Sequence, residues 1–319
     1  MVEKLIISVI LGVSIILGEI FMTLNAFLLI LISVFMHAAW NFISRASRPS
    51  ISFFWQAETF GLFLLLPFVF VAKIPWGELP LTFWLCFIGS SFFESVYCIG
   101  LSKSYKKIDI SIAYPLMRAL PVLLVAIITS VFHIGKSLNF WATAGMAVVA
   151  AGCFVLPQKS LKEFDFKHFL RSICGPVMLA AIGTTGYTIT DSMALNKLLE
   201  YSASSSFVTT CIYFFMIKSG ICVCLLPVVF GIREERNDLF NKCLKTLNPY
   251  LVGIFTGIAY LLVLWAMGMV SNVSYLQAFR QLSLPLGVAM GIIFLHEKFT
   301  VPKVIGVLMI VIGLVLTVC

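Results

Sequence analysis

The sequence predicts an all-α polytopic membrane protein, organised as a ten-helix inverted-repeat bundle of five plus five helices, with an extra N-terminal helix if residues 1–22 also span. Hydrophobic residues make up 61% of the 319 positions and charged residues 11%, against about 25% charged in an average soluble domain. Apolar blocks long enough to cross a bilayer, which takes about 20 residues, follow one another along the chain. Such runs must be helical, because backbone polar groups in hydrocarbon have to be satisfied within the segment.

The expected spans are read from the apolar runs between polar loops. They lie at 5–21, 24–43, 51–72, 81–101, 110–132, 140–156, 174–195, 206–230, 249–270, 274–295 and 302–319. The net charge of +8 comes from short basic loop clusters, which membrane topology requires. The expected partners are therefore the lipid bilayer and a small-molecule substrate, without nucleic acid, in a monomer or homodimer.

The chain repeats itself about the polar stretch that begins at Gln158. Glu58 stands nine residues before Pro67, and Lys218 stands nine residues before Pro227. The segments DISIAYPLMR and SNVSYLQAFR each end in an arginine, and all paired positions are 160 to 162 residues apart. The expected organisation is an N-terminal segment at 1–22, a first five-helix repeat at 23–157, a linker at 158–173 and a second repeat at 174–319.

An odd number of spans in each repeat has a topological consequence. Two such units insert in opposite senses, which is the architecture of many secondary transporters, with the substrate site near the midplane between the halves. The expected function is therefore secondary active transport of a small solute across a membrane, in either direction.

Several segments resemble the EamA branch of the drug/metabolite transporter superfamily. They are HAAWN at 37–41, LSKSYKKIDISIAYPLMRALP at the third-to-fourth helix junction and LHEKFTVPKVIGVLMIVIGLVL near the end. The resemblance covers about 24–319 and implies ten helices, with repeat helices four and nine beside a central cavity. Two features depart from the family: Lys136 stands where Glu297 occurs in the second half, and residues 1–22 are additional. HAAWN, GYTITDSMAL and SNVSYLQAFRQLS also bear a faint likeness to membrane proteins associated with phosphonate utilisation.

Lysine and arginine counts predict the orientation. The loops after repeat helices one, three, five, seven and nine carry fifteen basic residues: Arg45, Arg48, Lys103, Lys106, Lys107, Lys159, Lys162, Lys167, Arg171, Arg233, Arg236, Lys242, Lys245, Lys298 and Lys303. The opposite loops carry three: Lys73, Lys136 and Lys197. The first set is expected to be cytoplasmic in a bacterial inner membrane, with Cys319 outside, whereas the resemblance implies both termini inside. Residues 1–21 are either an anchor helix, a misassigned start or a signal peptide.

Six ionisable residues lie inside the expected repeat spans: Glu58, Glu94, Asp191, Arg118, Lys218 and Arg280. Charges at bilayer depth are costly and mark a substrate or ion pathway by default. Three acids against three bases also favour mutual pairing. Asp191 and Arg118 lie closest to span ends, where snorkelling or helix locking is the alternative.

Polar and aromatic companions accompany these charges: His37, Trp40, Asn41, Gln56, Tyr97, Tyr114, Tyr187, Tyr260, Trp265, Gln277 and Gln281. His37 and Asn41 share a helix face. Glu58, Glu94 and His37 are candidate proton carriers, with an interhelical hydrogen bond as the other reading of His37. Arginine forks bind carboxylate or phosphonate oxygens bidentately. Arg118, Lys218 and Arg280 therefore favour an anionic or zwitterionic metabolite, unless acids already neutralise them.

Pairs of glycines predict close helix packing rather than nucleotide binding. They are Gly145 and Gly152, Gly306 and Gly313, Gly253 and Gly257, and Gly287 and Gly291. The first two pairs resemble the helix-contact face of small dimeric relatives, which implies that repeat helices five and ten pack together.

Enzyme chemistry, metals and cofactors are not expected. His296-Glu297 opens like a zinc motif, but Thr300 stands where the second histidine is required. The sequence has no G-x-S-x-G and no Walker-type loop. The alternatives kept open are a proton-coupled exporter of lipophilic cations or drugs, and a non-transporting scaffold or channel.

Overall fold

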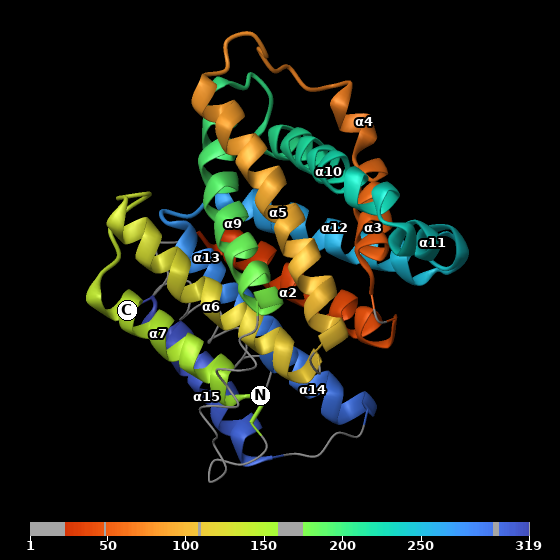
Figure 1. The fold of residues 1–319 in the computed structure, drawn as a ribbon. Coiled ribbons are helices and arrows are strands. Elements are labelled where there is room, and N and C mark those ends of the chain that lie inside the picture. Colours follow the sequence, from red (N-terminus) through yellow and green to blue (C-terminus); the bar gives the residue numbers. More distant parts are fainter. Residues whose placement is uncertain (1–22, 48, 108–109, 159–174, 296–299, 319) are drawn as a thin grey trace, which may run out of the picture.

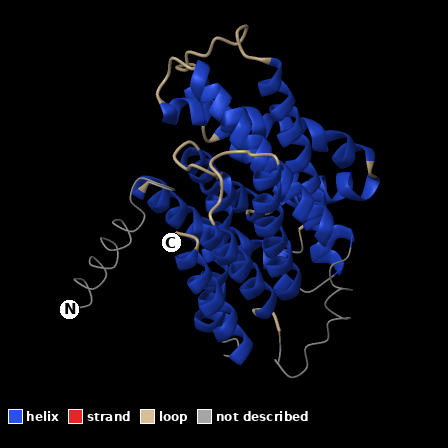
Figure 2. Ribbon diagram, turned by 90° about the vertical axis from the view of Figure 1, so that its left-hand side faces the viewer, coloured by secondary structure: helices blue, strands red, loops and turns tan. Residues whose placement is uncertain are grey.

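The computed structural model describes residues 23–47, 49–107, 110–158, 175–295 and 300–318. Within these ranges every regular element is a helix (Figures 1 and 2). The α-helices are α2 (Leu24–Ser47), α3 (Ile51–Phe63), α4 (Leu66–Val69), α5 (Leu81–Lys107), α6 (Ile110–Val131), α7 (Phe140–Val155), α9 (Gly175–Tyr201), α10 (Ser206–Gly231), α11 (Arg233–Asn241), α12 (Asn248–Met267), α13 (Val273–Phe279), α14 (Ser283–Leu295) and α15 (Val301–Leu316). Two 3₁₀ turns, η1 (Cys243–Lys245) and η2 (Arg280–Leu282), complete them.

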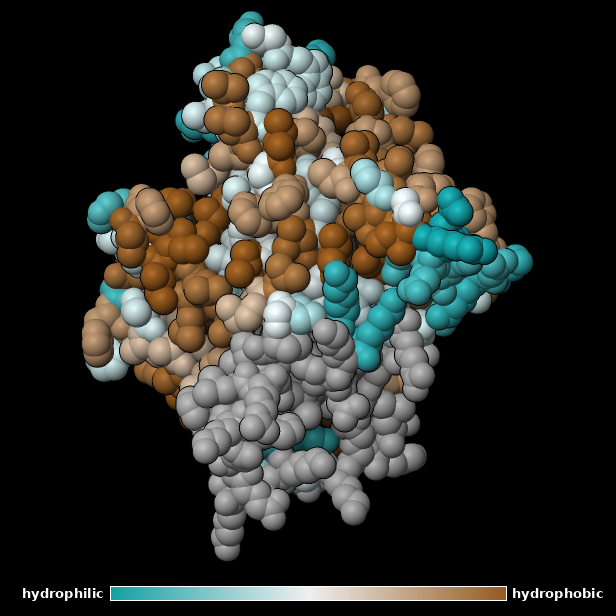
Figure 3. All heavy atoms as spheres, viewed as in Figure 1, coloured by the Kyte–Doolittle hydropathy of each residue, from teal (hydrophilic) through white to brown (hydrophobic). Residues whose placement is uncertain are grey.

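The described helices have the lengths and the apolar surface of a multi-pass membrane protein. Four described helices are long and apolar enough to span, at Leu24–Ser44, Leu81–Lys106, Ser206–Gly231 and Asn248–Met267. Shorter apolar helices lie at Met117–Val131, Phe140–Val155 and Val301–Leu316. Large apolar side chains such as Phe70, Phe140 and Val223 are 81%, 76% and 69% exposed, and apolar side chains cover much of the face in Figure 3. A bilayer provides the apolar surroundings that such a surface requires.

Side-chain caps fix where several helices begin. Ser50 accepts a hydrogen bond from the Phe53 N–H at the start of α3, and Asn139 accepts one from Ala142 at the start of α7. Asn272 accepts one from Ser274 before α13. Each cap satisfies a backbone donor that the helix itself leaves free.

Two expected spans are not single helices. The span 51–72 ends as an α-helix at Phe63, and the short α4 follows a break at residues 64–65. Pro67 has no N–H to donate to the carbonyl of Phe63, four residues earlier, so the first helix stops there. The expected span 274–295 is divided by η2 into α13 and α14. Pro285 likewise cannot donate to Gln281, which lies within that turn.

The helices pack in pairs that join the two halves of the chain. α5 lies along α9, α2 along α12, and α7 along α15 (Figure 1). α3 contacts both α12 and α10, and α10 also contacts α5. The core is thus built from elements that lie far apart in sequence.

Glycines allow the closest of these approaches. A Cβ on Gly145 would lie 2.5 Å from the Gly313 carbonyl oxygen, and one on Gly152 would lie 2.8 Å from that of Gly306. The backbones of α7 and α15 therefore meet through these four glycines.

The other expected glycine faces differ from each other. A Cβ on Gly253 would lie 2.5 Å from the carbonyl oxygen of Ala57, and one on Gly257 would lie 3.0 Å from Leu64, so this pair faces α3 and the break that follows it. Among the described residues, Gly287 has no neighbour within 4 Å of such a Cβ, so the structure shows no close contact at this position. The side-chain surroundings of Gly291 lie outside the described residues, as do segment 1–22, most of the 158–173 linker and His296-Glu297.

Candidate functional site

A small cavity of about 40 Å³ lies where six helices and η2 meet. Its lining contains most of the charged residues expected inside the spans. The lining residues are His37, Trp40, Phe54, Glu58, Glu94, Tyr97, Cys98, Leu101, Tyr187, Lys218, Thr256, Tyr260 and Arg280. This volume holds a few water molecules at most, and ligand pockets are commonly about 300 Å³ or larger. In this structure the cavity is therefore smaller than a metabolite requires.

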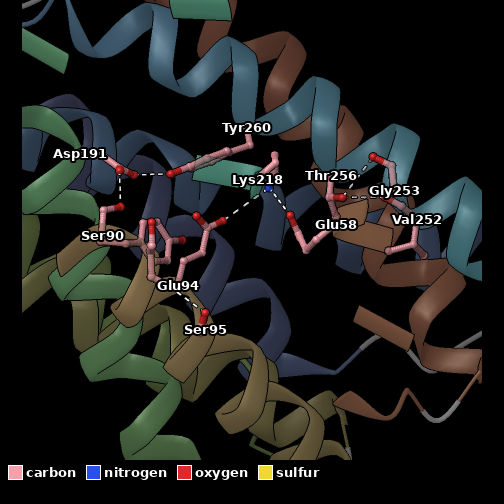
Figure 4. Close-up of polar contacts among 12 residues, drawn as sticks. Glu58, Ser90, Glu94, Ser95, Asp191, Lys218, Val252, Gly253, Thr256 and Tyr260 are labelled. Atoms are coloured by element: carbon pink, nitrogen blue, oxygen red, sulfur yellow. Dashed lines mark hydrogen bonds and ion pairs between the residues drawn. The ribbon is translucent and has the colours of Figure 1, made fainter. Parts of the chain in front are cut away.

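A buried ion cluster occupies one side of the cavity (Figure 4). The ammonium of Lys218 contacts a carboxylate oxygen of Glu58 and lies 3.5 Å from Oε1 of Glu94. The lysine side chain is 2% exposed and each carboxylate side chain 8%. Lys218 belongs to α10, whereas Glu58 and Glu94 belong to α3 and α5. The mutual pairing expected from the balance of charges thus exists here, with two acids on one base.

Aromatic rings complete the surroundings of the Lys218 ammonium. Nζ lies 4.6 Å from the ring centroid of Tyr260 and 5.4 Å from that of Phe214. A ring face at this distance attracts a cation, and more strongly once the group has lost its water. The site therefore holds a positive charge with two carboxylates and two aromatic faces.

Arg280 occupies the other side of the cavity and is 2% exposed. Its guanidinium donates to Oε1 of Gln277 at 3.3 Å and to the hydroxyl of Tyr187 at 3.4 Å. No described carboxylate forms an ion pair with it, and its Nε is buried without a hydrogen-bond partner. A buried cation with no counter-charge is costly, so Arg280 is well placed to hold an anionic group of a ligand.

His37 is positioned between Arg280 and its own helix. The Trp40 indole N–H donates to Nδ1 of His37 at 2.8 Å, and Nε2 of His37 lies 3.3 Å from an Arg280 nitrogen. Trp40 can only donate, so Nδ1 of His37 accepts, and a neutral imidazole then carries its proton on Nε2. Arg280 also can only donate, so the 3.3 Å approach of Nε2 is a close contact between α2 and η2.

Asp191 lies outside the cavity lining and is fully buried. Its Oδ1 accepts from the hydroxyls of Ser90 and Tyr213, the latter at 2.8 Å, and its Oδ2 accepts from Tyr260. The donors come from α5, α10 and α12. Asp191 therefore ties four helices together and does not snorkel to an interface, and its partners are hydroxyls rather than bases.

Arg118 also lies away from the cavity lining. Its guanidinium donates to the backbone carbonyl of Arg280 at 3.0 Å and to Ser283 Oγ at 2.7 Å. It contacts the carbonyl exposed by the 3₁₀ turn η2, so it supports the break in the helix. Of the two arginines expected to bind an anion, Arg280 therefore lines the cavity and Arg118 does not.

Of the remaining expected residues, some line the cavity and others lie outside it. Tyr97 lines the cavity and packs edge-on against Tyr187, with ring centroids 5.8 Å apart. Asn41 lies outside the lining, donates to the His37 carbonyl at 2.7 Å and accepts from Tyr105 at 3.4 Å. Gln281 is buried and donates to the Gln277 carbonyl at 2.8 Å.

Sequence reasoning missed the hydroxyls of Ser90 and Tyr213, and the lining residues Phe54, Cys98 and Thr256. Ser90 precedes Glu94 by four residues, which places both on one face of a helix. That spacing indicates that Ser90 faces the same interior as Glu94. Phe54, Cys98 and Thr256 carry no such signal, because their types are common in any apolar helix.

The described residues contain no group of three or more His, Cys, Asp or Glu side chains arranged to hold a metal ion. The site is instead a set of paired and unpaired charges in apolar surroundings. It is suited to binding a small ion or zwitterion and to exchanging a proton or a counter-ion.

The chain is similar in sequence to a curated protein over a short stretch, and similar in fold to a solved structure over most of its length. No family model matches the chain. A stretch of 56 residues, 18% of the chain, is 43% identical to the quaternary ammonium compound-resistance protein QacF of Klebsiella aerogenes. The chain spans half the length of that relative. A solved crystal structure matches over 91% of this chain and 95% of its own, with a TM-score of 0.61 and 18% identity. This likeness establishes a shared fold.

Proposed function

We propose that the chain is an EamA-type secondary transporter of a small anionic or zwitterionic metabolite. The observation that carries the proposal is the buried cavity with charges of both signs, in which Arg280 has no carboxylate partner among the described residues. Buried charges of this kind mark substrate or ion pathways in membrane proteins. The sequence resemblance to the EamA branch supports the same function.

The helix contacts support an inverted repeat of five plus five helices. If α2, α3, α5, α6 and α7 correspond to α9, α10, α12, α13–α14 and α15, the main contacts occur in matched pairs. The contact of α2 with α12 corresponds to that of α9 with α5, and α3 with α12 corresponds to α10 with α5. The contact of α6 with α9 corresponds to that of α14 with α2. Two bundles related in this way allow alternating access by rocking about a site between them.

The anionic part of the substrate is assigned to Arg280. A guanidinium holds carboxylate or phosphonate oxygens through paired N–H donors, and the Arg280 Nε is still free of a partner. The cationic part, in a zwitterion, is assigned to the carboxylates of the ion cluster. Oε2 of Glu94 is buried and has no hydrogen-bond partner.

A second candidate function is the export of quaternary ammonium compounds. The match to QacF favours it, and the carboxylates and ring faces around Lys218 would suit such a cation. The two candidates differ in the role of Arg280. A lipophilic cation is repelled by a nearby guanidinium in a poorly screened cavity, whereas a zwitterion requires it.

A thermal-shift experiment on the purified full chain distinguishes them. The probes are β-alanine, 2-aminoethylphosphonate and tetramethylammonium. The variants are Arg280→Ala and, as control, Arg233→Ala at an exposed position at the start of α11. We expect the two zwitterions to stabilise the wild type and Arg233→Ala. Their affinity for Arg280→Ala should fall about tenfold or more, the value of a charge-assisted hydrogen bond. Stabilisation by tetramethylammonium alone, retained in Arg280→Ala, would contradict the proposal in favour of the second candidate.

A further inference from the structure

Lys218 occupies a position in which a ligand cation would be bound. Its ammonium lies against Glu58 and Glu94 and over the ring of Tyr260, and all of these groups line the cavity. Two carboxylates and an aromatic face are the surroundings that proteins provide for ammonium ligands. Here the cation is supplied by the protein itself.

The charges of this cluster do not balance. Two carboxylates face one ammonium, so one negative charge is left when all three groups are ionised. The Lys218 ammonium makes its shorter contact with Glu58. Oε1 of Glu94 lies 3.5 Å from the same ammonium, and Oε2 of Glu94 has no hydrogen-bond partner. The lysine is therefore shared unequally between the two carboxylates.

The ion pair also crosses between the two expected repeats. Lys218 comes from α10 in the second, and Glu58 and Glu94 come from α3 and α5 in the first. A rocking movement of one half against the other changes the distance between the ammonium and the carboxylates. The strength of this pair is thus coupled to the conformational change that transport requires.

We propose that Lys218 is a tethered counter-cation: it offsets one of the two negative charges of the Glu58–Glu94 pair when the site is empty, and the ammonium group of a zwitterionic substrate replaces it there. This inference rests on the proposed transport function and specifies how that site recognises a primary amine. It implies that the empty carrier can reorient because its carboxylates keep a cation between them in the absence of substrate.

Chemical rescue tests the assignment without knowledge of the substrate. Lys218→Ala leaves the carboxylates without their cation and opens the space of the lysine side chain. We expect n-butylammonium to raise the Tm of the purified Lys218→Ala variant by about 5 °C or more through ligand linkage. Sodium at equal ionic strength should have a much smaller effect. The wild type and the control Lys197→Ala, whose exposed lysine pairs with Glu200, should not respond to the amine.

A second variant covers the case in which Lys218→Ala folds poorly. Glu58→Gln, Glu94→Gln and Lys218→Met combined leave an uncharged cluster of similar volume, which should fold without amine and show no stabilisation by it. A Lys218→Ala protein purified in n-butylammonium and unaffected by its removal would overturn the assignment. So would equal stabilisation of the triple variant.

Transport provides the functional arm, in proteoliposomes with radiolabelled β-alanine and 2-aminoethylphosphonate. We expect Lys218→Ala to retain exchange of labelled for unlabelled substrate and to lose net flux at least tenfold, because the empty form cannot reorient with an unneutralised carboxylate pair. Equal loss of exchange and net flux in a folded variant would contradict the counter-cation role. Failure of the wild type in both modes would instead contradict the proposed function, while the amine rescue still reports on Lys218.

Discussion

Asp191 shows how a single carboxylate can organise several helices of this protein. Three hydroxyls from α5, α10 and α12 converge on it, and water has no access because the residue is fully buried. Hydrogen bonds to a charged acceptor are stronger than neutral ones, and an unsatisfied buried donor is costly. Since Asp191 lies behind Tyr260 rather than in the cavity lining, we assign it to holding the site walls together.

The first prediction concerns this carboxylate. Asp191→Ala removes the acceptor of three buried hydroxyls and should lower the free energy of unfolding by about 2–4 kcal/mol. Asp191→Asn keeps an Oδ1 acceptor for Ser90 and Tyr213 and should lose about half as much. Thermal unfolding in one detergent measures both variants. An Asp191→Asn variant that retains full stability but loses all substrate binding would contradict the structural role.

At the scale of whole elements, small residues decide how closely the helices approach. α7 and α15 meet backbone to backbone at Gly145 and Gly152, with their partners Gly313 and Gly306. A helix pair in lipid gains little from burying apolar area and depends on such close packing. The spacing of these glycines along the sequence therefore predicts that α7 and α15 pack closely.

The second prediction compares two glycines in similar helices. A methyl group on Gly152 would lie 2.8 Å from a backbone oxygen and 2.9 Å from a backbone nitrogen of α15, so Gly152→Ala must separate the helices and should cost about 1–3 kcal/mol. Gly287→Ala meets nothing within 4 Å and should be neutral or stabilising by up to about 1 kcal/mol. Thermal unfolding measures the pair. Equal Tm values for the two variants would show that α7 and α15 do not pack as described.

α11 anchors the start of α3 from the other half of the chain. The Glu235 carboxylate accepts from the Ser52 N–H at 2.9 Å, and Asp238 accepts from the Ser50 hydroxyl. Acidic groups are favourable at a helix N-terminus, where the helix dipole is positive. Lys106 adds an ion pair to Glu235 at 3.5 Å, which ties the beginning of α3 to the end of α5.

The sequence predicted most elements because apolar length alone determines a spanning helix. It did not predict the break after Phe63, since Pro227 occurs at the matching position in α10 and leaves that helix intact. The sequence also identified the six charged residues, but it could not predict their partners. The contacts of Lys218 with Glu58 and Glu94 join three helices, so they depend on tertiary packing. Asp191 accepts from hydroxyls on three other helices, and no sequence spacing relates those hydroxyls to it.

For the whole molecule, the third prediction concerns orientation. Basic connections between spans favour the cytoplasm, so position 234 in α11, which connects α10 to α12, should be reached by a membrane-impermeant maleimide only after cells are opened. Glu234→Cys places the thiol at an exposed site. Labelling of Glu234→Cys in intact cells would show that the orientation is the opposite of the one predicted.

The native thiol in this loop should not interfere with that measurement. Cys243 is 1% exposed, and burial together with the neighbouring Asp238 carboxylate raises the pKa of its thiol to about 12. The thiolate is the reactive form, so Cys243 stays almost entirely protonated at neutral pH and gains reactivity only as pH rises toward that pKa. The Glu234→Cys signal should therefore exceed that of the parent protein several-fold at pH 7.

The last prediction concerns energy coupling across the whole carrier. Glu58, Glu94 and His37 line the cavity as candidate proton carriers. Glu94 is the preferred one, because it makes the weaker contact with Lys218: its Oε1 lies 3.5 Å from the ammonium. His37 already accepts from Trp40, and Glu58 makes the shorter contact with Lys218.

In proteoliposomes, an imposed pH difference should therefore drive accumulation of β-alanine or 2-aminoethylphosphonate beyond equilibrium, by about tenfold per pH unit for each coupled proton. Glu94→Gln cannot release a proton and should abolish this dependence. Exchange should continue at a lower substrate affinity, because Glu58 is then the one carboxylate of the pair left for the substrate ammonium. Glu200→Gln, at an exposed position, should behave as wild type. A channel would only equilibrate the substrate, and uptake that ignores both the pH difference and the membrane potential would exclude coupling through this cluster.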